Sequence, residues 1–374
     1  NALSSNTTAG SNTALGFNTL VTNTTGSYNT ATGNGALYYN TTGGYNTGVG
    51  VSALRLNTTG SKNVAVGNNA LDANTTGTNN TASGYRSLYA NTTGNNNTAT
   101  GSASLVSNTT GNNNTASGRE ALHRNTTGNF NTATGRHSLY SNTEGEYNTG
   151  TGYGTLYSNT TGSKNTAIGF NSLFANTEAG NNTALGFYAG DGITTGNNNV
   201  MLGYGTDPSA VDGTNQIVVG ASAVGHGDNI AVIGNSDMTA IHPADDNGVD
   251  LGSSSYSYKD LYVDGTANIA NMNMGVNSTI TSSTTFNGTA TIIPVNTSSA
   301  SVTVTIDSDQ KVAGRILIFK QLAGAGGNSF TIATEGSSKI QPNYGTAPTD
   351  SYTITFPGYD SVHLFCDGTN WYYI

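Results

Sequence analysis

The sequence predicts an all-β protein with a repetitive shaft and a small C-terminal domain. We expect a parallel β-solenoid, or β-roll, of 17-residue coils at 1–240, a neck or linker at 241–274, and a β-sandwich or jelly-roll-like domain at 275–374. Three observations predict this. A 17-residue unit recurs without slipping, it has no apolar stripe with helical period, and the last hundred residues form short β-rich runs between turn residues.

The repeat unit reads N-T-T-G-x-x-N-T-A-x-G-x-x-(A/S/T)-L-x-x. Its opening Asn returns once per unit from Asn6 to Asn176, and the phase continues through 193–226, which makes thirteen units. A shortened fourteenth unit follows at 229–237. Gly, Asn and Thr are poor helix formers. Stacked coils about 4.8 Å apart would make a rod roughly 60 Å long, in which equivalent residues form ladders.

Each position of the unit has a predicted role. The central glycine predicts a corner that needs a positive φ or a close backbone approach, and N-T-T-G predicts a second corner. Two corners leave two short strands, one with a small residue at its centre and one that carries the Leu. The corner glycines include Gly16, Gly33, Gly50, Gly67, Gly84, Gly101, Gly118 and Gly135. The core ladder includes Leu20, Leu37, Leu54, Leu71, Leu88, Leu105 and Leu122.

The N-terminal residues fit the same register. Ala2 and Leu3 occupy the A-L position of a coil whose first half is absent, because Leu3 lies one full repeat before Leu20. The shaft is therefore expected to start in mid-coil. Its first edge then either comes from a longer fibre or awaits a partner.

Composition limits the classes of function. The chain has 50 glycines, 9% charged residues, a formal net charge of −9 and a pI near 4.8. This charge argues against a nucleic-acid partner, and without a run of eighteen apolar residues no membrane insertion is expected. The core of roughly one Leu and one Ala per coil is small, so association with other copies is expected. We expect no cofactor, and we expect the single Cys366 to be a small buried hydrophobe.

Several segments resemble a known family. "NTALGFNTL", "NTAIGFNSL", "NQIVVGASA" and "NIAVIGNSD" are similar to the head repeats of YadA-like trimeric autotransporter adhesins. The resemblance covers about residues 6–237 and implies a left-handed parallel β-roll that trimerises. The period of 17 is longer than is usual in that family, and its membrane-anchoring barrel is missing from this sequence.

The C-terminal third resembles a second class of protein. "DLGSSSYSYKDLYVDG" is similar to a segment common in phage tail fibres, and "YDSVHLFCDGTNWYYI" is similar to the terminal strands of their tail-fibre modules. Between them lie about six short strands, among them "SVTVTID" and "RILIFKQL", separated by turn residues. This pattern is typical of a β-sandwich or a jelly-roll-like barrel.

No strong catalytic or metal-binding motif is present. The five histidines, His123, His137, His226, His242 and His363, lack the spacing of metal ligands. Asp245, Asn247 and Asp250 alternate around a glycine as in a calcium loop, but the bidentate Glu is missing, and an ordinary turn explains them too. Glu144 and Glu146 are the nearest approach to the carboxylate pair of a glycosidase, and a solvated corner explains them better.

Two features could modify or decorate the shaft surface. The opening N-T-T is formally a glycosylation sequon, although regular stacking of corner asparagines also explains it. The candidate sites are Asn23, Asn40, Asn57, Asn74, Asn91, Asn108, Asn125 and Asn159. The most variable positions follow the two glycines and often carry Tyr, Phe or Arg, the residues that interfaces favour.

These observations favour an extracellular structural fibre or fibril subunit, similar to a phage tail fibre, that self-assembles as a homotrimer or a higher assembly and presents a binding surface. The alternative is a bacterial surface adhesin that binds host matrix, a cell-surface glycan or a receptor. A fibre that degrades polysaccharide has the least support, because no catalytic residues stand out.

Overall fold

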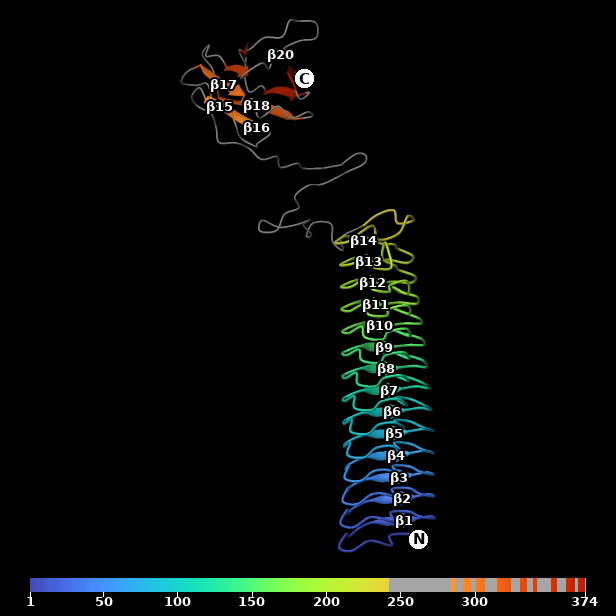
Figure 1. Cartoon of the computed structure of the whole chain (residues 1–374). Coiled ribbons are helices and arrows are strands. Elements are labelled where there is room, and N and C mark those ends of the chain that lie inside the picture. The colour runs from blue at the N-terminus through green and yellow to red at the C-terminus, as the bar shows by residue number, and fades with distance from the viewer. Residues whose placement is uncertain are drawn as a thin grey trace. The chain divides into compact units, whose positions relative to one another are not determined.

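The computed structural model divides the chain into two compact units, Asn1–Ala244 and Asp245–Ile374 (Figure 1). The structure describes residues 1–241, 284–286, 292–296, 301–306, 315–323, 330–334, 339–341, 351–354, 361–366 and 369–373. Nearly all of the expected neck, together with His242 and the candidate calcium residues Asp245, Asn247 and Asp250, lies outside these ranges.

The first unit, called the shaft, is a parallel solenoid with one three-residue strand in each coil (Figure 1). Its 14 strands form one sheet in chain order. They are β1 (Thr13–Leu15), β2 (Thr30–Thr32), β3 (Thr47–Val49), β4 (Val64–Val66), β5 (Thr81–Ser83), β6 (Thr98–Thr100), β7 (Thr115–Ser117), β8 (Thr132–Thr134), β9 (Thr149–Thr151), β10 (Thr166–Ile168), β11 (Thr183–Leu185), β12 (Val200–Leu202), β13 (Ile217–Val219) and β14 (Ala231–Ile233). Equivalent residues pair, as Ala99 does with Ala116, so neighbouring coils are offset by one full repeat unit up to β13.

The core of the shaft consists of two apolar ladders. The central residue of each strand points inward, and Ala99 and Ala116 are fully buried. Its neighbours Thr98 and Thr100 are exposed, as the period-two alternation of a strand requires. Leu105 and Leu122 form part of the second ladder and are also fully buried. The interior therefore repeats from coil to coil, while the outward strand residues are free to vary.

The expectation of a second strand in each coil is wrong. Within residues 1–241 the segment that carries the Leu consists of turns, and its leucines have φ between +47° and +54°. This left-handed conformation costs about 1–2 kcal/mol for an L-residue, whereas full burial of a Leu side chain contributes about 1.5–3 kcal/mol. Hydrogen bonding between coils continues through these turns, because the amide of Leu105 donates to the carbonyl of Ala121 at 3.0 Å.

Leu3 at the start of the shaft behaves as an ordinary member of the leucine ladder. Its φ is +53°, its amide donates to the carbonyl of Thr19 at 3.1 Å, and its side chain packs partly buried against the core. The leucine ladder therefore extends one coil beyond Leu20.

The central glycines need both a positive φ and a close approach. Their φ lies between +122° and +147°, and a Cβ on Gly118 would lie 2.6 Å from the carbonyl carbon of Gly135. The glycine of N-T-T-G needs only the close approach, since a Cβ on Gly111 would lie 2.5 Å from the carbonyl oxygen of Gly128. The left-handed residue of that corner comes two positions later, at Asn113 with φ +57°.

Two ladders of buried asparagines tie the coils together. Nδ2 of Asn108 donates to Oδ1 of Asn91 at 2.8 Å and to the carbonyl of Gly111 at 3.0 Å. The bond between opening asparagines recurs at ten successive steps. In the second ladder, Nδ2 of Asn114 donates across coils to the carbonyl of Gly128 at 2.8 Å. Because these amides are buried and hydrogen-bonded, their burial carries little penalty.

The second unit is a two-sheet sandwich, which confirms the predicted fold class. One sheet has the order β15-β17-β19-β21 and the other β16-β18-β22-β23-β20. The strands are β15 (Thr284–Phe286), β16 (Ile292–Asn296), β17 (Val302–Ile306), β18 (Ile316–Ala323), β19 (Phe330–Thr334), β20 (Ile340–Gln341), β21 (Ser351–Ile354), β22 (Ser361–Cys366) and β23 (Trp371–Tyr373). Val304 and Ile332 of the first sheet share one buried cluster with Phe319 and Trp371 of the second. Cys366 is buried in the same cluster.

We predict that Gly118→Ala destabilises the shaft by about 2–5 kcal/mol, because it adds backbone strain and a clash with the next coil. Gly10→Ala is the matched control, since a Cβ there meets nothing within 4 Å and should leave stability unchanged. Thermal unfolding followed by circular dichroism measures both. Equal melting temperatures for the two variants would contradict the role assigned to the central glycine.

Candidate functional site

The opening asparagines of the repeat are interior residues. All eight candidate glycosylation sites are fully buried, and an N-linked glycan would have to be attached to the same Nδ2 that donates two hydrogen bonds, as in Asn108. The folded shaft therefore leaves no room for a glycan at these positions. Sequence reasoning identified the corner but not the side-chain direction, which depends on the turn that follows.

The remaining candidate chemistry does not converge. Among the residues described, no group of three or more His, Cys, Asp or Glu side chains could hold a metal ion. Glu146 accepts a hydrogen bond from Nδ2 of Asn129 at 2.8 Å, while Glu144 is exposed. In the described ranges no helix is long and apolar enough to span a bilayer.

The outer surface of the C-terminal coils of the shaft carries large exposed apolar side chains. We call this surface the apolar face; it lies on β10 to β13 and on the position that follows each central glycine. Its members are Ile168, Phe170, Leu185, Phe187, Val200, Leu202, Tyr204 and Ile217, each 37–58% exposed. Contiguous exposed apolar surface on this scale usually marks an interaction site. In earlier coils the same positions vary, from the polar Thr100 and Ser102 to the exposed Leu15 and Phe17 of the first coil.

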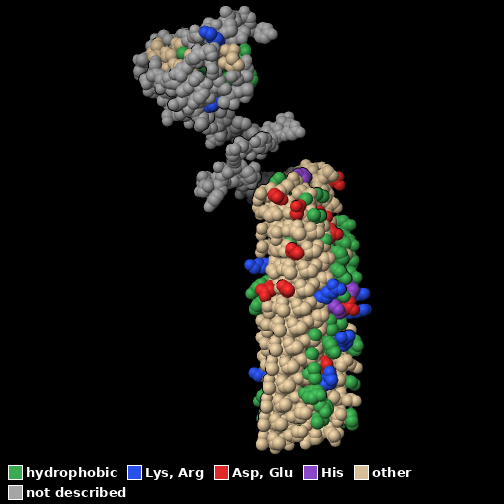
Figure 2. Space-filling model, viewed as in Figure 1, with side chains coloured by type: hydrophobic (Ala, Val, Ile, Leu, Met, Phe, Trp, Pro, Cys, Tyr) green, Lys and Arg blue, Asp and Glu red, His purple; other side chains and the backbone are tan. Residues whose placement is uncertain are grey.

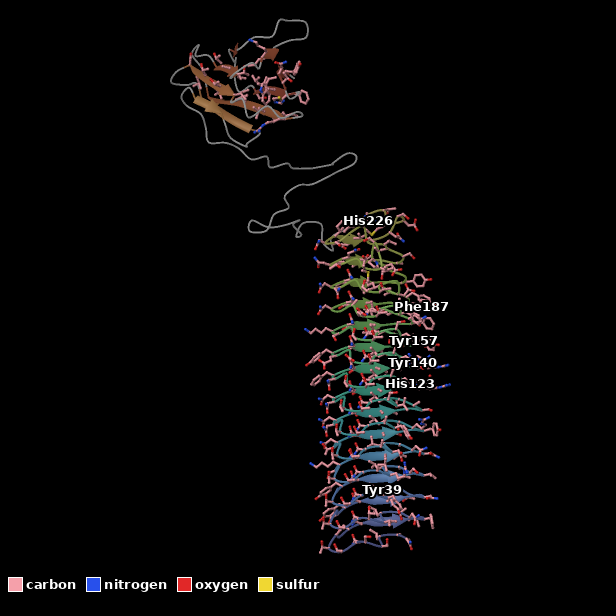
Figure 3. All side chains as sticks on the ribbon, in the orientation of Figure 1. Tyr39, His123, Tyr140, Tyr157, Phe187 and His226 are labelled. Carbon is pink, nitrogen blue, oxygen red and sulfur yellow. The ribbon has the colours of Figure 1, made fainter. Side chains whose placement is uncertain are left out.

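Aromatic rings stack along one edge of the shaft in two ladders. In the first, Phe170 stacks on Tyr153 at 5.2 Å and on Phe187 at 4.9 Å between ring centroids. In the second, Tyr140 stacks on His123 at 4.9 Å and on Tyr157 at 5.0 Å. Figure 3 labels Phe187 of the first ladder and His123, Tyr140 and Tyr157 of the second. Since successive coils repeat at the strand spacing of about 4.8 Å, equivalent rings are held at stacking distance.

A cationic cluster lies on the same edge. It consists of Arg86, Arg119, Arg124 and Arg136, which occur within four successive coils. Figure 2 shows basic, acidic and histidine side chains gathered at mid-height of the shaft, next to hydrophobic ones. Three of these guanidinium groups lie over tyrosine rings, Arg86 over Tyr89 at 4.5 Å. Arginine on an aromatic ring is an arrangement that binding surfaces favour.

One carboxylate lies inside the cationic cluster. Glu120 accepts hydrogen bonds from Arg119 at 2.9 Å and pairs with Nε2 of His137 at 2.8 Å. Partial burial raises the pKa of Glu120, but the hydrogen bonds and charges of Arg119 and His137 outweigh it, so the pKa is lowered overall. Glu120 therefore stays ionised and neutralises part of the cluster. Among the described residues no carboxylate forms an ion pair with Arg86 or Arg124.

Two carboxyl groups meet near the C-terminal end of the shaft. Burial raises the pKa of Asp207 to about 6, opposed by a hydrogen bond from the Gly192 amide at 3.2 Å and reinforced by the charge of Asp191. Burial also raises the pKa of Asp191. Both groups bind protons more readily in the folded chain than in the unfolded one. The contribution of Asp207 to stability is therefore present below about pH 4 and is lost as the pH rises through about 6.

We predict that Asp207→Asn stabilises the shaft at pH 8 by about 1 kcal/mol, after discounting the shift for partial solvent exposure. At pH 4 variant and parent should be equally stable, because the carboxyl group is then protonated. Melting temperatures at pH 4, 6 and 8 measure this. Asp212→Asn removes an exposed carboxylate from the next coil and is the control. A pH-independent effect of Asp207→Asn would contradict the prediction.

Comparison with known proteins gives no family assignment. No protein-family model, curated protein or solved structure matches the chain. The resemblance of residues 6–237 to adhesin head repeats, and that of the C-terminal region to phage tail-fibre modules, therefore rest on the quoted motifs alone and remain expectations. The solenoid architecture stands on the coordinates themselves.

Proposed function

We propose that the chain is an extracellular structural fibre subunit, similar to a phage tail fibre, that self-assembles and presents a binding surface. The single observation that carries the proposal is the apolar face on a shaft of continuously hydrogen-bonded coils. Fourteen strands in register, at about 4.8 Å per step, give this unit a length of roughly 60 Å. The proposal assigns a mechanical and binding role rather than a reaction.

The composition of the shaft supports a fibre role. Its interior repeats one Ala-sized and one Leu side chain per coil, as at Ala116 and Leu122, with buried asparagines between coils. Each coil contacts only its neighbours, so length can grow without a larger core. Such a unit is long and has a regular surface, and a fibre subunit needs both properties.

The apolar face supports self-assembly, in the first instance as a homotrimer. Leu185 and Phe187 are 45% and 44% exposed, and burying such side chains between copies contributes about 25 cal/mol per Å² of apolar area. A closed assembly covers the face on every copy, whereas a monomer leaves it in water. The trimer is the form implied by the resemblance to adhesin head repeats.

The cationic cluster favours the second candidate, a bacterial surface adhesin. An adhesin needs surface side chains that bind its ligand. Arg86, which lies over the ring of Tyr89, forms such a group with it. The two roles share the same shaft and differ in what the exposed edge contacts.

We predict that the purified chain forms short rods that associate, and that Leu185→Thr with Phe187→Ser weakens the association at least tenfold. Thr and Ser occupy the same positions in the coil at 91–107, so the variant should fold. Sedimentation equilibrium gives the stoichiometry and electron microscopy gives the shape.

The matched control for this experiment is Phe130→Asn with Tyr147→Asn. These stacked rings are similarly exposed but lie on a different corner of the coil, where other units carry Asn. The control should associate as the parent does. A parent that stays monomeric at high concentration, or a control variant that dissociates equally, would count against the proposed assembly through the apolar face.

A further inference from the structure

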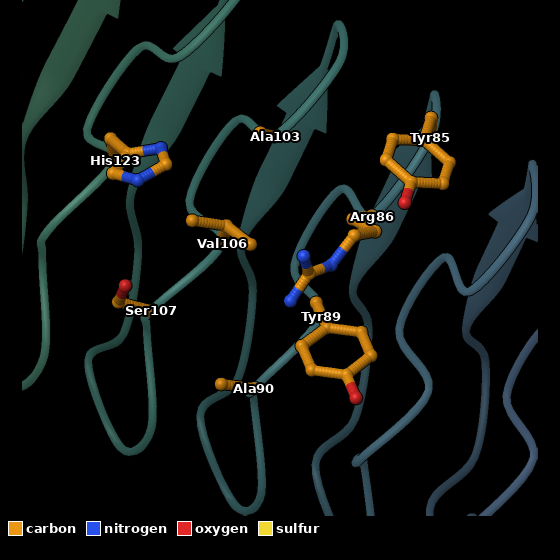
Figure 4. Close-up of a pocket in the computed structure, with 8 residues that line it drawn as sticks. All are labelled: Tyr85, Arg86, Tyr89, Ala90, Ala103, Val106, Ser107 and His123. Atoms are coloured by element: carbon orange, nitrogen blue, oxygen red, sulfur yellow. The ribbon is translucent and has the colours of Figure 1, made fainter.

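A cavity interrupts the exposed edge of the shaft next to the cationic cluster. Its volume is about 440 Å³, within the range of about 300–1,000 Å³ typical of small-molecule sites. It lies between the coil that carries Arg86 and Tyr89 and the coil that carries His123, and Figure 4 shows these side chains facing it from opposite sides. We call this cavity the notch.

The notch exists because the coil between its walls has small side chains. Ala103, Val106 and Ser107 line it, whereas the equivalents of Ala103 and Val106 are Arg86 and Tyr89 in the coil before. One row of the outer side-chain ladders is therefore missing. The backbone does not change, since β6 and β7 pair in the usual register, and the notch forms without strain in the shaft.

The walls of the notch offer unused polar groups. Arg86 lies over the ring of Tyr89 at 4.5 Å and has no ion-pair partner among the described residues. Nδ1 of His123 is buried without a hydrogen-bond partner. Burial lowers the pKa of this ring overall, and the nearby Ala103 carbonyl opposes the shift in part. Leaving a buried nitrogen without a hydrogen-bond partner is unfavourable. A ligand that hydrogen-bonds it recovers this cost.

The local charge selects an anionic ligand. The chain carries a net charge of −9, yet the four arginines of the cationic cluster lie within a span of four coils that includes the notch. Among the described residues, Glu120 is the one carboxylate paired inside that cluster. A positive region on an acidic protein attracts anions and orients them. Arg86 can bind a planar carboxylate or a sulfate with two parallel hydrogen bonds.

The shape of the notch favours a saccharide over a peptide. An extended peptide binds by adding to a free strand edge, but β6 is paired on both sides, with β5 and with β7. The notch instead combines an apolar floor at Ala103 and Val106 with hydrogen-bonding groups at Ser107 and His123. A sugar ring has the complementary arrangement, with an apolar C–H face and a rim of hydroxyl groups.

We propose that the notch binds one residue of an acidic saccharide, with its carboxylate or sulfate on Arg86, its hydroxyl groups near Ser107 and His123, and its ring over Val106. This inference rests on the proposed function, because it names the ligand class and the site of the binding surface.

Titration calorimetry on the full chain tests the proposal with a hexuronic-acid tetrasaccharide, its sulfated counterpart, the neutral tetrasaccharide and inorganic sulfate. We expect binding of one or both acidic oligosaccharides and at least tenfold weaker binding of the neutral one. The comparison of the first two probes identifies the acidic group. Sulfate bound as tightly as the oligosaccharides would overturn the proposal, because it would reduce the notch to a general anion site.

Variants taken from the repeat itself test the location. Arg86→Ser and Val106→Tyr introduce residues that other coils carry at the same positions, such as Ser52 and Tyr89, and each should weaken binding at least tenfold. Lys164→Asn removes the same charge as Arg86→Ser from a different corner and should bind as the parent does. Equal losses in Lys164→Asn and Arg86→Ser would overturn the proposal in favour of unspecific charge attraction.

Failure of the notch proposal can be distinguished from failure of the fibre proposal. Absence of binding to every probe by a parent that still forms associated rods would overturn the notch proposal and leave the fibre proposal standing. If the parent chain itself forms no associated rods, the proposed function is overturned. Binding that survives Val106→Tyr unchanged would place the ligand elsewhere and overturn the assignment to the notch.

Discussion

The register of one full repeat unit between neighbouring coils is the constraint on which the rest of the shaft depends. Each coil is the template for the next, because the central glycine lies against the backbone of the following coil and any Cβ would collide there, as at Gly118. The same register brings each opening Asn within hydrogen-bonding distance of its equivalent, as Asn108 and Asn91 show. A single inserted residue would break the glycine contact, the asparagine bond and the leucine ladder together, whereas substitutions at the central strand position, such as Met201 and Val218, keep the pairing.

The outer positions are under no such constraint. The position that follows the central glycine holds Tyr85, Ser102, Arg119 and Phe170 in different coils, and none of these changes the strand pairing. The surface can therefore differ from coil to coil while the backbone stays the same. The notch lies within the cationic cluster, and the apolar face follows nearer the C-terminal end of the same regular shaft. The binding properties of each surface depend on the order in which its side chains follow one another.

The sequence was sufficient to predict the parts of the fold that depend on the period. Recurrence of Gly and of alternating small and β-branched residues predicts parallel, in-register strands, and the coordinates agree. The left-handed conformation of Leu122 could not be predicted, because local preference opposes it and only burial in a complete ladder outweighs that preference. The burial of Asn108 was missed for a similar reason: turn preference identifies a corner but not which way its side chain points. The notch could have been found by aligning the units, where the small residues Ala103 and Val106 stand out, but its walls depend on turn geometry.

The separation of the notch from the apolar face bears on how assembly and ligand binding coexist. Val106 and Phe170 belong to coils four steps apart, roughly 20 Å along the shaft at the usual strand spacing. A second copy seated on the apolar face can therefore leave the notch open. The cationic cluster around the notch adds a selective element, since like charges on two copies repel at close approach. Apolar attraction at the C-terminal coils combined with repulsion at the middle coils would favour one defined contact over unlimited lateral association. The same arginines that repel a second copy attract an acidic saccharide, so one cluster would serve both purposes.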